Sequence, residues 1–83
     1  MKSYVYRIRV MPLKDVLDTQ GRAVEETLRR MGLNVESVRV GKSIDVEIPA
    51  ASRDEGKKQA QKIAQDLLAN PLIETFSVDE VHA

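Results

Sequence analysis

The chain has 83 residues and a mass of 9.3 kDa, which is the size of one domain, predicted over residues 1–83. Thirteen Lys and Arg balance thirteen Asp and Glu, so no net positive charge would attract nucleic acid or an anionic membrane. There is no Cys and one His, which excludes disulfides, thiolate metal sites and the usual zinc sites. Apolar runs are too short to span a membrane, and we expect a cytoplasmic protein.

The first half of the chain predicts a strand followed by a helix. In residues 4–11 one face of the strand is apolar and the other carries arginines, and Pro12 ends it because proline has no N–H. Asp18 or Thr19 caps a helix whose apolar residues recur every three or four positions. Gly32 then supplies a left-handed stop. Leu13 and Leu17, in the loop between, are expected to tuck under the edge of the domain.

The second half predicts the same order of elements. A strand over residues 35–40 is joined to a strand over residues 44–48 by a tight hairpin at Gly41-Lys42. Ser52 and Glu55 form a capping box for a helix that runs to Asn70, with Leu67 and Leu68 on its apolar stripe. A last strand covers residues 73–81.

This order predicts an α+β domain of the ferredoxin-like βαββαβ type. Four antiparallel strands would form the sheet, both helices would cover one face, and the first and third strands would be central neighbours. The other face would be mixed in character, with Arg39 nearby and with these members: Val5, Arg7, Arg9, Asp45 and Glu47. Opposite charges on adjacent strands attract, so this face is either wet or covered by a second copy in a sheet-mediated dimer.

Nucleic-acid binding is disfavoured on this face. Tyr4 and Tyr6 would point toward the helices, and Asp45 and Glu47 would cancel the nearby arginines. His82 is more simply a residue of the terminal tail than a metal ligand. Gly21 and Gly56 lie in first helical turns, where close packing is the simpler explanation for Gly21, while Gly56 has no explanation from the sequence.

Three stretches together resemble one protein family. They are L-K-D-V-L-D-T-Q-G-R-A-V at residues 13–24, V-R-V-G-K at residues 38–42, and L-L-A-N-P-L-I-E at residues 67–74. In this order and spacing they are similar to the PurS family, a subunit of phosphoribosylformylglycinamidine synthase. The resemblance spans essentially the whole chain.

The resemblance implies a role in the fourth step of de novo purine synthesis. That enzyme uses ATP, with Mg²⁺ implied, and ammonia released from glutamine. PurS would join a glutaminase subunit (PurQ) to a synthetase subunit (PurL), with no active site and no bound cofactor of its own. It would pair as a homodimer or tetramer. We expect a partner-facing loop formed by Leu13, Lys14, Asp18, Gln20 and Gly21, and a second contact formed by Arg39, Gly41 and Lys42.

One alternative has the same order of elements. Small regulatory domains of the ACT type also fold as βαββαβ and bind amino acids near the turn after the first strand. They use glycine-rich backbone at that turn, whereas here it reads Met11-Pro12-Leu13-Lys14, with no glycine before Gly21. An independent enzyme is disfavoured because no nucleophile or acid–base pair stands in a plausible site.

Overall fold

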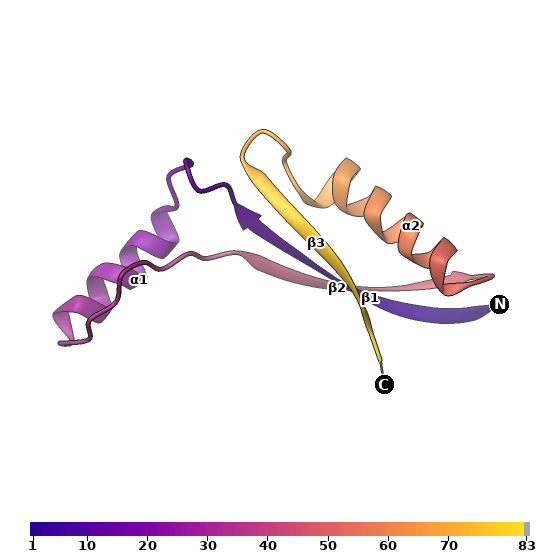
Figure 1. Ribbon diagram of the computed structural model, residues 1–83, viewed down its shortest axis with the longest axis horizontal. Helices are drawn as coiled ribbons and strands as arrows, with labels where there is room; N and C mark the ends of the chain where they lie inside the picture. The colour runs from indigo at the N-terminus through magenta and orange to yellow at the C-terminus, as the bar shows by residue number, and fades with distance from the viewer. Residues whose placement is uncertain (83) are drawn as a thin grey trace.

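Three strands form an antiparallel sheet in the computed structural model, which describes residues 1–82. They are β1 (Lys2–Pro12), β2 (Lys42–Ala50) and β3 (Glu74–Val81), in the order β2-β1-β3 (Figure 1). β1 pairs Ile8 with Ile44 of β2 on one side and with Val78 of β3 on the other. The predicted central position of the first strand and its pairing with the strand over residues 44–48 are therefore confirmed. The prediction that this second strand is also central is wrong, because β2 lies at an edge of the sheet formed by residues 1–82.

One face of the sheet carries helix α2 (Arg53–Ile63) and the hydrophobic core. Even-numbered residues of β1 point to this face, because side chains alternate along a strand. The core consists of Tyr6, Ile8, Val10, Ile48, Ala60, Ala64, Ala69 and Val78. The Tyr6 hydroxyl donates a hydrogen bond of 2.6 Å to the Arg53 carbonyl, which ties β1 to the first turn of α2.

The second helix begins as predicted and ends differently. The Ser52 hydroxyl accepts the Glu55 N–H at 3.2 Å, which is one half of the predicted capping box. After Ile63 the helix widens into a π-helical turn, η1 (Ala64–Leu68), which the Ala69 N–H closes on the Ala64 carbonyl at 2.9 Å. The wider turn rotates side chains off the helical stripe. Leu67 is 79% exposed, so its predicted place in the core was wrong.

Helix α1 (Thr19–Arg30) has the predicted ends but not the predicted position. Asp18 caps it, and Gly32 follows with a φ of 86°. However, α1 lies beyond one end of the sheet (Figure 1) and makes no substantial contact with a strand or with α2. The prediction of two helices on one face is therefore wrong. We call residues 13–41 the arm; within it Leu17 is 67% exposed and is not tucked under the domain.

The predicted strand over residues 35–40 and the hairpin at Gly41-Lys42 are also wrong. Residues 38–41 run straight into β2, so the sheet has three strands among residues 1–82 instead of four. A two-residue hairpin needs a positive φ at its turn, and Gly41 does not have one. Such a hairpin would also pair Val40 with Ser43 and so set the two apolar patterns out of phase. The result is an elongated molecule of 52 × 30 × 14 Å.

Candidate partner-binding site

The predicted interface residues come together where the arm leaves the sheet, a region we call the arm junction (residues 12–21 and 38–42). Two open hollows flank it. One, of about 390 Å³, is lined in part by Asp18, Gln20, Gly41 and Lys42. The other, of about 350 Å³, is lined in part by Leu13, Lys14, Asp18 and Arg39. The residues of both predicted contacts thus lie in one region, and Ile73, from the loop before β3, also lines the first hollow.

Asp18 links the two stretches of the arm junction. Its Oδ1 accepts the Gly21 N–H at 2.9 Å, and its Oδ2 accepts the Val40 N–H at 2.7 Å. These backbone hydrogen bonds, the Gly21 bond first, lower the pKa of the Asp18 carboxyl, while its partial burial opposes them. One carboxylate therefore both caps α1 and holds the returning chain beside it.

Two glycines let the backbone come close at the same place. A Cβ at Gly21 would lie 2.6 Å from the Val38 carbonyl oxygen, so the predicted close packing of Gly21 is confirmed. A Cβ at Gly41 would strike Met11 Sδ and the Val10 carbonyl oxygen. Gly41 thus serves a close approach of chain segments and not the predicted turn.

The remaining predicted residues of the arm junction are exposed. They are Leu13, Lys14, Gln20, Arg39 and Lys42. The Leu13 N–H donates to the Ile73 carbonyl at 2.8 Å, which fixes the start of the arm against the loop before β3. Asp18, Gly21 and Gly41 therefore fix the backbone of the arm junction, while its exposed side chains are available to contact a partner.

The bare face of the sheet, opposite α2, carries the other predicted residues. Arg7 and Asp45 form a bidentate pair, with Nε–Oδ1 at 2.9 Å and Nη2–Oδ2 at 3.1 Å. This hydrogen bonding raises the pKa of Arg7 and lowers that of Asp45. Val5 lies opposite Glu47, and Arg9 lies opposite Ser43. Arg39 belongs to the arm, so its predicted place near this face within one chain is wrong.

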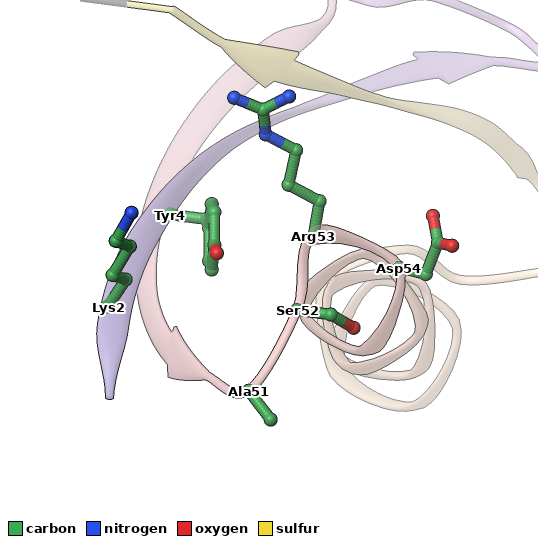
Figure 2. A pocket seen from close by; sticks show the side chains of 6 residues that line it. All are labelled: Lys2, Tyr4, Ala51, Ser52, Arg53 and Asp54. Atoms are coloured by element: carbon green, nitrogen blue, oxygen red, sulfur yellow. The ribbon is translucent and has the colours of Figure 1, made fainter.

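A further hollow lies elsewhere, between the start of β1 and the first turn of α2. It measures about 580 Å³ and is lined by Lys2, Tyr4, Ala51, Ser52, Arg53 and Asp54 (Figure 2). Arg53 reaches toward the strands, where its Nε lies 3.4 Å from a carboxylate oxygen of Glu80. The hollow contains none of the predicted site residues and no pairing of a nucleophile with a base.

The described residues contain no metal-binding cluster. Across residues 1–82, no three Asp, Glu or His side chains lie close enough to hold an ion. Within the same residues, neither helix has the length and hydropathy needed to cross a bilayer.

Asp18→Asn is expected to loosen the arm at its junction. The amide keeps one acceptor oxygen where the carboxylate offered two. Because asparagine caps helices as well as aspartate does, this oxygen is expected to stay with the Gly21 N–H, and the Val40 N–H loses its partner. Hydrogen exchange at the Val40 amide should then become faster, with α2 unaffected. The exposed residue Asp15 provides the matched control, Asp15→Asn, which should leave the Val40 amide unchanged.

The same carboxylate predicts a pH dependence of the wild-type arm. Because the pKa of Asp18 in the folded chain lies below its usual value of 3.8, the stabilising effect is complete above that usual value. It is lost as the pH falls through the lower, folded-state pKa. The Val40 amide resonance should therefore titrate below pH 3.8 in the wild type and not in Asp18→Asn. A Val40 resonance that titrates equally in both chains would contradict this assignment.

A family profile named PurS, described as phosphoribosylformylglycinamidine (FGAM) synthase, matches residues 5–82. The chain belongs to the PurS family. Curated PurS relatives include that of Thermotoga maritima, 33% identical over 98% of this chain and 100% of the relative. PurS of Bacillus subtilis is 38% identical over 95% of this chain and 99% of the relative. The resemblance seen in the three sequence stretches is thus confirmed.

Solved PurS structures share the extended shape of this chain. A chain of the Thermotoga maritima PurLQS structure gives a TM-score of 0.90 at 33% identity, covering 98% of this chain and 100% of that one. Thermus thermophilus PurS gives 0.84 at 36% identity, with the same coverage. Agreement at that coverage includes the arm, so the position of α1 outside the sheet is common to these PurS chains.

Sequence reasoning missed the exposed apolar side chains of the PurS arm. Val24 and Met31 are among the apolar residues that recur every three or four positions along α1, and Leu33 follows Gly32; all three are exposed. Their amphipathic spacing was visible in the sequence, but it does not say which molecule covers them.

Proposed function

We propose that this PurS chain joins the glutaminase and synthetase subunits of FGAM synthase and performs no chemical step itself. The observation that carries the proposal is the full-length match to a chain of the Thermotoga maritima PurLQS structure, arm included. A match of this kind along the whole chain favours a PurS role over an ACT-type regulatory domain.

The proposal places the cofactors of the reaction outside this chain. ATP and Mg²⁺ belong to the synthetase subunit in this scheme, and the donor groups of this chain do not fit a metal site, since residues 1–82 hold no cluster of three carboxylates or imidazoles. In this proposal the reaction takes place in the cytoplasm. The contribution of this chain is then to hold the glutaminase and synthetase subunits together in a fixed relative position.

Within the proposal, the exposed side chains of the arm junction contact the larger subunits. Lys14 and Lys42 line separate hollows on the two sides of Asp18. Leu13 adds an exposed apolar surface beside Lys14. A pair of cations around a partly apolar centre suits an acidic rim on a partner surface. The bare face of the sheet, with Arg7, Arg9 and Glu47, stays a prediction for contact with a second copy.

Reconstitution tests the bridging role. Glutamine-dependent formation of the amidine is expected to need all three subunits, whereas turnover with added ammonia should need only the synthetase. Equal glutamine-dependent turnover with and without this chain would refute the role.

The placement at the arm junction has its own test. Lys14→Glu and Lys42→Glu are each expected to weaken assembly at least tenfold, because they put like charges against the proposed acidic rim. Lys57→Glu, on the exposed side of α2, is the matched control and should assemble normally. If both junction variants assemble with wild-type affinity, the placement is wrong while the bridging role stands.

A further inference from the structure

We propose that Leu72 is a rigid apolar anchor that inserts into an apolar pocket with a carboxylate rim on one of the larger subunits of the synthase. Leu72 lies in the tight turn that leads into β3, which we call the Asn70 turn (residues 70–74). The inference rests on the proposed bridging function and deepens it. It names the side chain that carries the contact and the chemistry of the surface that receives it.

Hydrogen bonds within the Asn70 turn hold its backbone in one conformation. The Asn70 carbonyl oxygen accepts the Ile73 N–H at 3.1 Å and the Glu74 N–H at 2.7 Å. The Asn70 side-chain oxygen accepts the Leu72 N–H at 3.1 Å, and Glu74 Oε1 accepts the Asn70 N–H at 2.7 Å. Pro71 has a fixed φ and no N–H. Every backbone N–H of the turn is therefore bonded within the turn itself.

Leu72 makes little use of this order inside its own chain. Its side chain is 83% exposed, so the turn holds an apolar group in water. A group that is already held in place loses less conformational entropy on binding than a group on a flexible loop, so a rigid turn raises the affinity for a partner. A rigid turn with an exposed apolar side chain is therefore suited to anchor an interface.

The turn adjoins other exposed apolar side chains at the base of the arm. Ile73 is 43% exposed, and its carbonyl oxygen accepts the Leu13 N–H at 2.8 Å. Ile73 also lines the first hollow of the arm junction together with the exposed residue Leu17. The turn and the base of the arm lie at the same end of the sheet (Figure 1). A single exposed leucine is ordinary, but a group of apolar side chains rimmed by polar ones marks an interaction site.

The charges around these apolar side chains indicate what kind of surface they bind. The Asp18 and Glu74 carboxylates accept backbone N–H groups of their own chain, and Asp15 is the other carboxylate of the arm junction. The exposed cations of the junction take part in none of the ion pairs formed among residues 1–82; they are Lys14, Arg39 and Lys42. A chain with no net charge thus presents a cationic surface around an apolar centre, which fits an apolar pocket rimmed by carboxylates.

A second copy of this chain is a poor occupant for this surface. A twofold contact would set the surface against itself, so the cations of one copy would face those of the other. Like charges brought together in an interface weaken it. A larger subunit has a different sequence and is free to carry the complementary carboxylates.

Capture by the affinity-tagged chain tests the anchor, with the purified glutaminase and synthetase subunits as the probes. Leu72→Ala is expected to weaken the capture of one of them about tenfold or more, as the loss of one buried leucine side chain implies. Leu67→Ala is the matched control, because Leu67 is 79% exposed but lies on η1, outside both hollows of the arm junction. It should leave capture unchanged. Both side chains are exposed, so both variants should keep the wild-type midpoint in urea.

Asn70→Ala tests whether the turn positions the anchor. The alanine removes the acceptor of the Leu72 N–H and leaves the Leu72 side chain in place. Capture should weaken severalfold, and Leu72→Ala should then cost less in the Asn70→Ala chain than in the wild type, because a loose turn no longer places the anchor. An equal cost of Leu72→Ala in both backgrounds would refute the positioning role of Asn70.

Equal capture by the wild type and Leu72→Ala would overturn the anchor, and so would an equal loss in Leu67→Ala. If sedimentation shows that Leu72→Ala changes self-association while capture stays normal, a second copy covers Leu72 and the proposal is wrong. Normal capture by Leu72→Ala, with glutamine-dependent turnover that still needs the chain, refutes the anchor alone. Weakened capture by Leu72→Ala, with turnover that does not need the chain, refutes the bridging role alone.

Discussion

Ile8→Ala is expected to lower the free energy of unfolding by about 2–5 kcal/mol. Ile8 is fully buried at the centre of β1, between Ile44 and Val78 in the register of the sheet and beneath α2. Truncation removes buried methyl groups and leaves a cavity that neighbouring aliphatic side chains can fill only in part. Domains of this kind are stable by about 5–15 kcal/mol, so the variant would lose a large share of its stability.

Urea denaturation measures this loss, at one fixed chain concentration because association also stabilises the folded state. Ile8→Val is the graded control, with an expected cost of about 0.5–1.5 kcal/mol. If Ile8→Ala costs no more than Ile8→Val, the core described around β1 is wrong.

Gly56→Ala is expected to destabilise the chain by about 1–3 kcal/mol through overpacking. Alanine ordinarily stabilises a helix relative to glycine by about 1 kcal/mol, so the expected sign is the reverse of the usual one. A Cβ at residue 56 would lie 2.9 Å from Cε2 and Cζ of the Tyr6 ring, and the Tyr6 hydroxyl is closer still. The ring is held in place by its bond to the Arg53 carbonyl, so it cannot yield without breaking that bond.

A double-mutant cycle with Tyr6→Phe isolates this contact. Tyr6→Phe alone costs stability because the Arg53 carbonyl loses its donor. In the Tyr6→Phe background Gly56→Ala should cost less, since the nearest atom is gone. The same denaturation assay gives all four corners of the cycle, and Lys57→Ala reports the effect of alanine at an exposed position of α2. A Gly56→Ala chain more stable than the wild type would contradict the geometry at Tyr6.

Local patterns in the sequence correctly predicted most helices and strands. They could not predict which segments distant in the sequence pack or pair with one another. The alternation in β1, the caps at Asp18 and Ser52, and the stop at Gly32 all depend on neighbouring residues and are confirmed. Whether residues 35–40 fold back on β2 depends on competition between chain segments. The mismatch of phase between Val40 and Ser43 was readable and argued against the hairpin.

The arm junction shows the same division. Its residues were chosen from the sequence stretches shared with PurS proteins, and the structure places all eight in one region. The bond from Val40 to Asp18 joins residues 22 positions apart, and no local pattern encodes it. Likewise, the reason for a glycine at residue 56 becomes visible only when Tyr6 is seen above it. Leu67 is exposed because the helix widens into a π-helical turn at residues 64–68. The spacing of apolar residues in the sequence does not reveal this widening.

The tight fit at the base of the arm has a mechanical consequence. Gly21 and Gly41 allow backbone to meet backbone there, with Asp18 as the clasp between them. Because the molecule is 52 Å long, a rotation of the arm about its junction would displace residues far from the junction more than residues close to it. Small changes in the hydrogen bonds of Asp18 or in the close contacts at Gly21 and Gly41 would therefore displace the far end of α1 by a larger distance. These few contacts fix the orientation of the arm relative to the sheet.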